Sequence, residues 1–290
     1  MARILGIGIA TLDIINTVDG YPAEDAEVRA VGQRVCRGGN ATNSLVVLAQ
    51  LGHQCAWGGV LVDGPDGNRV LDDLSGYGVD TTGCRRLPTG TMPTSYVVLN
   101  RCNGSRTIVH FRDLPEFGFD DFRAIDLSGV DWLHVEARNV AETGRMLADA
   151  AVRRPGLSRS VEVEKLRPDV EMLFGHAELL LFSRGYAEAR GHASAEALLD
   201  WVHEQAPQAD LVCSWGEAGA WALDRSGRLL HSPAHPPPRV VDTLGAGDTF
   251  NAGMIGGRLR GWPLDQALTH ATRLAGRKCG RMGFSGLDSL

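Results

Sequence analysis

The sequence predicts an α/β protein whose central sheet is mostly parallel and is covered by helices on both faces, in three layers. Two observations support this prediction. From residue 132 onward, short apolar runs of strand length alternate with stretches of helical length, an order typical of parallel sheets. No polar linker divides the 290 residues, so we expect one domain over residues 1–290.

The first part of the chain also alternates predicted strands with predicted helices. Gly38 and Gly39 lead into the first helix, and Gly52 ends it. Asn103-Gly104 lies between two β-rich runs and predicts a two-residue hairpin. The strands are expected at residues 3–9 and 56–62, and the helices at 41–51 and 68–77.

The second half of the chain continues this alternation and closes with a hairpin and two helices. Ser226-Gly227 predicts the hairpin, between runs at 221–224 and 228–231. Parallel strands are expected at 132–136, 160–164, 179–182 and 211–215. Helices are expected at 140–152, 170–174, 194–204, 246–259 and 264–279.

Two segments fall outside the alternating pattern, at about residues 13–37 and 92–113. Both consist of strand and hairpin signals, so we expect them to form a small β-rich lid, the flap, over the edge of the sheet. Exposed strand edges tend to be covered by a partner, which makes a homodimer through the flap the expected assembly.

Composition narrows the class of protein. Hydrophobic residues make up 43% and charged residues 22%, as in ordinary globular domains. The formal net charge of −6 argues against a broad basic surface, and no run approaches the roughly 20 apolar residues of a membrane helix. We therefore expect a cytoplasmic protein without nucleic-acid or membrane partners. The six cysteines include no CxxC pair, which predicts reduced thiols and no zinc site.

The basic residues limit how the chain could bind phosphates. Only Lys165 and Lys278 are lysines, and neither is followed by Ser or Thr, so a Walker-type phosphate loop is absent. Any phosphate chemistry must use arginines, a metal ion and backbone N–H groups.

The segment from Asp242 to Asp248 offers such backbone groups. Its glycines follow an apolar run and precede a helix, where the unpaired amides of Gly245, Ala246 and Gly247 would form an anion hole. Asp248 in the first turn could accept a proton from an attacking hydroxyl. The alternative is a glycine-rich helix start in which Asp248 only complements the helix dipole.

A second helix start carries groups suited to a polyol. Gly39 lets a ligand approach the backbone, and Asn40 and Asn43 share one face of the first turn. Amides both donate and accept hydrogen bonds, as a sugar requires. Asp13, just beyond the first strand, could accept two sugar hydroxyls. The alternatives are a helix cap for Asn40 and a turn aspartate for Asp13.

Together these segments resemble the PfkB (ribokinase-like) family of carbohydrate and nucleoside kinases. Its two signatures match residues 38–43 and 242–248. Within the family the chain is most similar to the ketose kinases, which phosphorylate the 1-hydroxyl of a ketose. That similarity extends over essentially the whole length and rests on residues 21–25, 37–43, 104–108, 161–165 and 236–251.

The resemblance implies a ribokinase-like fold and a role for each matching residue. Asp248 would be the catalytic base, with Gly245, Ala246 and Gly247 as the anion hole. The residues implied to bind the sugar are Asp13, Gly39, Asn40, Asn43 and Asp248. Those implied to bind ATP are Arg106, Gly216, Glu217, Ala218, Gly219, Pro236, Pro237, Gly245 and Gly247. Taken alone, Arg106 could be a solvated strand arginine, and the glycines and prolines ordinary turn residues.

The implied cofactors are ATP and Mg²⁺, with a monovalent cation such as K⁺ as a further candidate. Magnesium would arrive with ATP and need few protein ligands, so no residue is assigned to it. Many family members carry Asn-x-x-Glu after the third parallel strand, where this chain has Ser183-Arg184-Gly185-Tyr186.

The expected activity is ATP-dependent phosphorylation of a ketose, D-fructose to fructose 1-phosphate, by in-line transfer. Other acceptors stay open: ribose, a nucleoside, a sulfosugar or a ketodeoxy acid. So does a catalytically silent sugar-binding module. A nicotinamide-dependent oxidoreductase is disfavoured, because Gly6-x-Gly8 begins its fingerprint but Thr11 replaces the third glycine.

Overall fold

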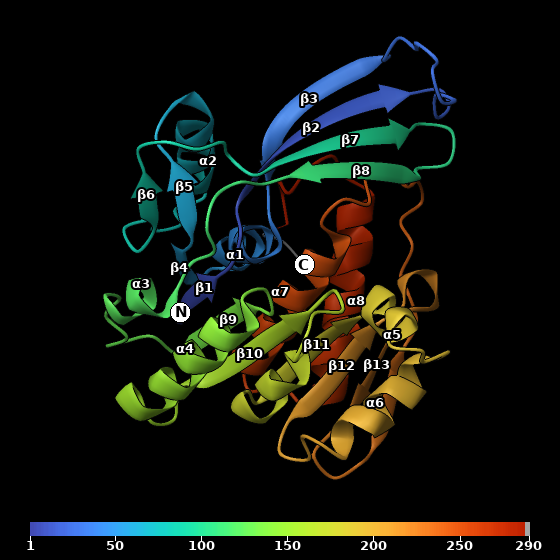
Figure 1. The fold of residues 1–290 in the computed structure, drawn as a ribbon. Helices are drawn as coiled ribbons and strands as arrows, with labels where there is room; N and C mark the ends of the chain where they lie inside the picture. The colour runs from blue at the N-terminus through green and yellow to red at the C-terminus, as the bar shows by residue number, and fades with distance from the viewer. Residues whose placement is uncertain (288–290) are drawn as a thin grey trace.

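The computed structural model describes residues 1–287, and an eight-stranded sheet forms its centre (Figure 1). The strand order is β14-β13-β12-β11-β10-β9-β1-β4. All neighbours from β4 to β12 are parallel, and β13 and β14 join antiparallel. The strands are β1 (Arg3–Ile7), β4 (Gln54–Gly58), β9 (Trp132–Glu136), β10 (Ser158–Val163), β11 (Leu179–Ser183), β12 (Asp210–Ser214), β13 (Ala220–Leu223) and β14 (Leu229–Ser232).

Helices cover both faces of this sheet, because its central strands are apolar on both sides. One face carries α1 (Asn40–Gln50), α7 (Ala246–Leu259) and α8 (Leu264–Cys279), which pack on one another. The other carries α4 (Val140–Arg153) and α6 (Ala195–His203) (Figure 1). The predicted three-layer α/β/α arrangement is confirmed.

A separate four-stranded sheet, the flap sheet, lies above the carboxyl ends of the central strands (Figure 1). Its order is β3-β2-β7-β8, with β2 at Thr11–Val18, β3 at Gly32–Gly38, β7 at Thr94–Asn100 and β8 at Arg106–Phe111. Residues directly opposite each other across neighbouring strands share a face. One such row is Cys36, Asp13, Ser95 and His110, and another is Val35, Ile14, Tyr96 and Val109.

Some predicted boundaries were wrong, for local reasons. The expected strand at 56–62 breaks at Gly59, a position where a side chain would collide with the Trp57 ring and the Gly8 carbonyl. Its second part, β5 (Val60–Val62), pairs with β6 (Arg85–Leu87) in a small sheet.

The helix expected at 68–77 begins earlier, as α2 (Pro65–Gly76), because Pro65 suits a first helical position. The expected two-residue hairpin is a five-residue loop between β7 and β8, and in it Gly104 has φ +72. The helix expected at 170–174 is the 3₁₀ helix Val170–His176. The remaining short helices are α3 (Phe119–Arg123), α5 (Arg184–Ala189) and the 3₁₀ turn Gly216–Ala218.

Candidate active site

A cleft of about 520 Å³ lies between the flap sheet and the carboxyl ends of the central strands. The carboxyl edge of a parallel sheet is where α/β proteins usually bind ligands. The flap contributes Asp13 and Arg106 to the lining, α1 contributes Asn40, and α7 contributes Asp248. The cleft thus gathers residues that lie far apart in the sequence.

One wall of the cleft is the start of α7. Gly245 caps this helix in the left-handed region, with φ +75. The amides of Gly245 and Gly247 donate no hydrogen bond to any of residues 1–287, whereas the Ala246 amide donates to Thr243 O at 3.3 Å. The described chain therefore leaves two of the three predicted amides free, and Ala246 is partly engaged.

Asp248 faces this cleft and is only 7% exposed. Its Oδ2 accepts a hydrogen bond from Asn43 Nδ2 at 2.6 Å, and Asn43 Oδ1 accepts one from Arg37 Nη1 at 2.6 Å. Burial raises the pKa of Asp248 to about 8, with Glu164 and Glu136 adding to the effect and Asn43 opposing it. The carboxyl group is not held in an arginine pair, since Arg37 pairs with Asp73.

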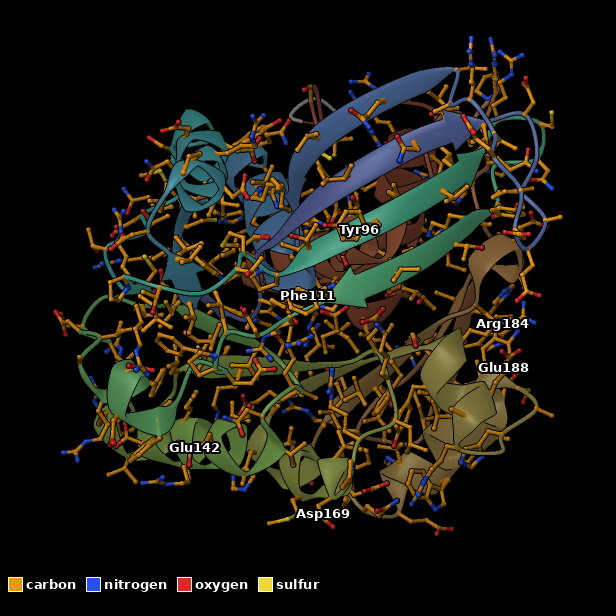
Figure 2. The ribbon with its side chains drawn as sticks, turned by 45° about the horizontal axis from the view of Figure 1, so that its top comes forward. Tyr96, Phe111, Glu142, Asp169, Arg184 and Glu188 are labelled. Carbon is orange, nitrogen blue, oxygen red and sulfur yellow. The ribbon has the colours of Figure 1, made fainter. Side chains whose placement is uncertain are left out.

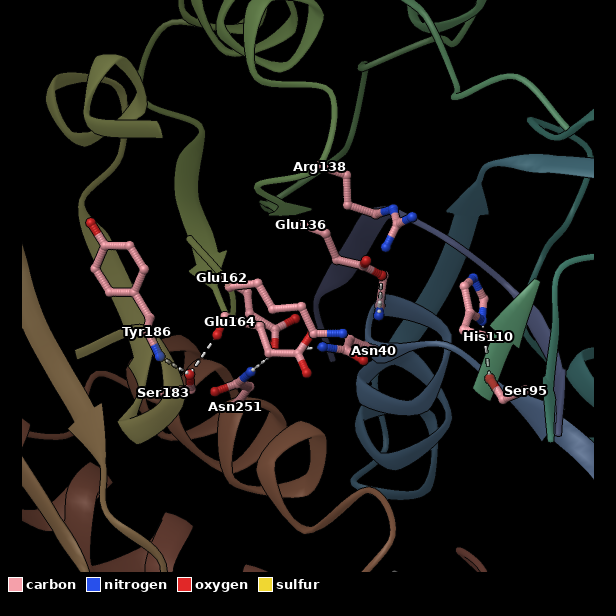
Figure 3. A network of polar contacts seen from close by, with 12 residues as sticks. Asn40, Ser95, His110, Glu136, Arg138, Glu162, Glu164, Ser183, Tyr186 and Asn251 are labelled. Carbon is pink, nitrogen blue, oxygen red and sulfur yellow. Dashed lines mark hydrogen bonds and ion pairs between the residues drawn. The ribbon is translucent and has the colours of Figure 1, made fainter. Parts of the chain in front are cut away.

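Two further carboxyl groups near Asp248 are buried, those of Glu162 and Glu136, and Figure 3 shows both. Glu162 Oε1 accepts hydrogen bonds from Asn40 Nδ2 at 3.1 Å and Asn251 Nδ2 at 3.0 Å. Glu136 Oε1 accepts from the backbone amides of Ile9 and Ala41, at 3.1 and 2.8 Å. Burial raises the pKa of Glu136 to about 7 and that of Glu162 well above its ordinary value. Amides, not cations, are the hydrogen-bond donors to these acids.

The flap sheet closes the cleft from above with a row of polar side chains. Asp13 accepts a hydrogen bond from Thr11 Oγ1 at 2.8 Å, and burial raises its pKa although Thr11 and Ser95 oppose the shift. The Ser95 hydroxyl lies 3.3 Å from His110 Nδ1. Gly39, beside Asn40, lines the cleft, and a side chain on it would sit 2.1 Å from Ile9 O, so the close packing of the two backbones requires glycine there.

The residues implied to bind ATP fall into two groups. Arg106 lines the cleft and donates to Thr243 Oγ1 at 3.2 Å, next to the start of α7. Gly216, Glu217, Ala218, Gly219, Pro236 and Pro237 do not line the cleft. Their turn follows β12, whose last residue Ser214 does line it, and a side chain on Gly219 would touch the chain that leads from Ser232 to Pro236. The Gly216–Gly219 turn therefore packs against residues 232–234, which lead to Pro236.

A family model described as "pfkB family carbohydrate kinase" matches residues 1–288, essentially the whole chain. The chain belongs to the PfkB family. This PfkB chain is 42% identical to ketohexokinase from Mus musculus, over 98% of both proteins. It is therefore an ATP-dependent sugar kinase, as the sequence predicted.

Solved structures agree on the fold. A structure of a putative ribokinase from Agrobacterium tumefaciens superposes with a TM-score of 0.83 at 23% identity, covering 97% of this chain and 92% of the other. Ribokinase from Cryptococcus neoformans, solved in complex with ADP, gives 0.81 at 20% identity, with 99% and 96% covered. Within residues 1–287, this PfkB chain has no helix long and apolar enough to cross a membrane.

Sequence reasoning did not assign several residues that line the cleft of this PfkB kinase. Glu162 and Glu164 alternate along the end of one parallel strand, which is a signal that could have been used, because strand ends of a parallel sheet meet at one edge. Ser95 and His110 gave no such signal. Their place in the cleft depends on strand pairing in the flap sheet.

Proposed function

We propose that this kinase transfers the γ-phosphoryl group of ATP to the 1-hydroxyl of a ketose, with D-fructose as the acceptor and fructose 1-phosphate as the product. The main support is one arrangement: a buried carboxyl group, Asp248, opens into the cleft next to the free amides of Gly245 and Gly247. The 42% identity to a ketohexokinase supports the choice of acceptor.

The acceptor would lie between the flap sheet and α1. Asp13, Asn40 and Asn43, with the backbone of Gly39, line this part of the cleft and offer donors and acceptors suited to neutral hydroxyl groups. Four arginines could have bound an anionic acceptor; Arg29 does not line the cleft, and the other three are already engaged. Arg34 pairs with Asp242, Arg37 with Asp73 and Arg138 with Glu116. These pairs favour a neutral sugar over a ketodeoxy acid or a sulfosugar.

In the proposed reaction, the ionised form of Asp248 takes the proton of the primary hydroxyl as the hydroxyl oxygen attacks the γ-phosphorus. The bond from that phosphorus to the β,γ-bridging oxygen breaks, and ADP leaves with the bond electrons. The Gly245 and Gly247 amides stabilise charge on the transferred group, and Arg106 binds the phosphates. The ATP base would lie against the Gly216–Gly219 turn and Pro236-Pro237. The flap sheet would exclude water, which limits hydrolysis of ATP.

Magnesium fits the acidic side of the cleft. Among residues 1–287, no three His, Cys, Asp or Glu side chains are grouped to hold a metal. Glu162 Oε2, however, is buried and has no hydrogen-bond partner. A hydrated cation carried by the ATP phosphates could bind there through water, since Mg²⁺ usually keeps several waters. When bound, it would neutralise phosphate charge.

A panel of acceptors tests this proposal. ADP release should be fastest with fructose, and phosphorus NMR should locate the new ester on C1. Faster turnover with ribose, a nucleoside or an anionic sugar would show that this compound, and not fructose, is the preferred acceptor. Sugar binding in a calorimeter without ADP formation would indicate a silent binding module.

We also propose that two copies associate through the outer face of the flap sheet. Figure 2 shows Tyr96 and Phe111 on that face. Their exposed fractions are 50% and 51%, and Val109 is 65% exposed. Patches of exposed apolar side chains on a sheet usually mark an interface. Sedimentation should show a dimer that Val109→Glu dissociates, while a monomeric wild-type protein would refute the proposal.

A further inference from the structure

Lys278 is a lysine with no exposed surface, in the last turn of α8. Its ammonium group donates to the main-chain oxygen of Asp242 at 2.9 Å and lies 3.2 Å from Asp242 Oδ2. The Phe284 ring lies 5.4 Å from it. Burying an ammonium group is costly unless it is paired, and an apolar pair would often serve stability better. Asp242 lies three residues before Gly245, the first residue of the anion-hole loop (Gly245, Ala246 and Gly247), so the pair can affect the conformation of that loop.

Asp242 connects four parts of the molecule around that loop. Its Oδ1 accepts a hydrogen bond from the amide of Leu244 at 3.0 Å, directly before Gly245. Its Oδ2 accepts from the Gly283 amide at 3.0 Å and from Arg34 of the flap sheet at 2.8 Å. Burial alone would raise the pKa of Asp242, but Lys278, Gly283 and Arg34 lower it overall, so the carboxylate stays charged.

Of the two cations, only Lys278 belongs to the body of the protein. Arg34 lies on β3, and its side chain is 28% exposed, whereas that of Lys278 is fully buried. If the flap moves when ligands enter, Arg34 moves with it. Lys278 would still compensate the Asp242 charge and keep the turn at Leu244 in place.

We propose that Lys278 and Asp242 form a buried positioning pair that holds the Gly245 loop in the shape that presents its amides to the transferred phosphoryl group. This inference rests on the anion hole of the proposed function. Neither side chain needs to touch the substrate. Their effect on the rate would come from the placement of the amides, where an error of about 1 Å can cost about 100-fold in rate.

The competing explanation is that the pair only stabilises the fold. Arg258 and Asp210 provide a matched control, because they form another partly buried ion pair, at 3.1 Å. Asp210 begins β12, and the residue that lines the cleft, Ser214, ends it, so this pair lies at the opposite edge of the sheet. Loss of Arg258 should lower the melting temperature and leave kcat unchanged.

The experiment compares the full-length wild type with Lys278→Ala and Arg258→Met, using ATP and fructose. We expect Lys278→Ala to lower kcat by about 100-fold, with the KM for fructose within about threefold. Methylammonium, a small cation with hydrogen-bond donors, should restore part of the lost kcat, and tetramethylammonium at equal ionic strength should not. A wild-type kcat in Lys278→Ala, or a loss that methylammonium does not restore, would overturn the inference.

Two further outcomes are informative. If Lys278→Ala does not fold, the double variant Lys278→Met with Asp242→Asn removes both charges and leaves no buried ion unpaired. Its kcat should still be low, and a wild-type kcat would overturn the inference. If the wild type releases no ADP with any acceptor, the proposed function has failed, and the inference fails with it. If the wild type turns over normally and the Lys278 variant has the same kcat, the inference about the pair is wrong and the proposed function still stands.

Discussion

Replacing Asp248 by Asn should slow the kinase and stabilise the fold at the same time. The pKa of Asp248 is raised by burial from 3.8 to about 8. Between these values the native state holds a proton that the unfolded state has lost, so stability falls as the pH rises through this window. At pH 7, about three pH units above the ordinary pKa of 3.8, this costs 1.36 kcal/mol per unit, so buried Asp248 lowers the free energy of unfolding by about 4 kcal/mol. Asn carries no such penalty and can still accept the hydrogen bond from Asn43.

The rate should fall because the variant lacks a proton acceptor. Loss of a general base costs about 10² to 10⁴ in rate, or about 3–5 kcal/mol of barrier. Steady-state ADP release measures the loss of rate, and thermal unfolding measures the gain of stability. Calorimetry with a non-hydrolysable ATP analogue should show that the variant binds ATP nearly as well as the wild type.

Asp265→Asn is the matched control for this experiment. Asp265 lies in the first turn of α8, is exposed, and accepts a hydrogen bond from the amide of Gln266, so its carboxylate complements the helix dipole. Its replacement should cost less than about 1 kcal/mol of stability and leave kcat unchanged. If Asp248→Asn behaves like this control, with a near-normal rate and a small loss of stability, Asp248 is not the base.

Three other variants test neighbouring parts of the site. Gly245→Ala should lower kcat at least tenfold, because φ is +75 and the new side chain would lie 2.2 Å from the Phe284 ring; a normal kcat would contradict this. Asn43→Ala removes the donor that lowers the pKa of Asp248, so the acid limb of the kcat/KM profile should move to higher pH, and a fixed limb would count against the assignment. Arg106→Met should raise the KM for ATP about tenfold without changing the KM for fructose, since a charge-assisted contact is lost, and equal effects on both would be evidence against a phosphate contact.

The sequence was most informative where an element and its function share one short segment. The start of α7 carries the turn glycines, the free amides and Asp248 within a few residues, and α7 and α8 have the predicted bounds. Asn43 was found in the same way, from its place in the first turn of α1. Local pattern and chemistry agree at these positions.

The unpredicted part of the site depends on contacts between distant segments. Arg34 and Asp242 are 208 residues apart, and Asn40 and Glu162 are 122 apart. Their pairing requires the flap sheet to lie over the carboxyl edge of the central sheet, which local patterns do not specify. Burial also depends on tertiary packing. In the sequence Glu162 has the pattern of an ordinary strand residue, and it becomes buried only because α1 and α7 pack over it. Its raised pKa follows from that cover.

The acidic groups in and near the cleft differ in how their charge is compensated, and this difference gives the proposed transfer a direction. Burial raises the pKa values of Asp248, Glu162 and Glu136, and the uncharged amides that donate to them do not offset that effect, so a proton can be taken up there. Before the anion-hole loop, Asp242 is instead compensated by two cations and stays ionised. A carboxylate already paired in this way is a poor base and a good anchor. The same residue type therefore serves as proton acceptor in one place and as support in another, and the difference comes from whether the neighbouring donors carry charge.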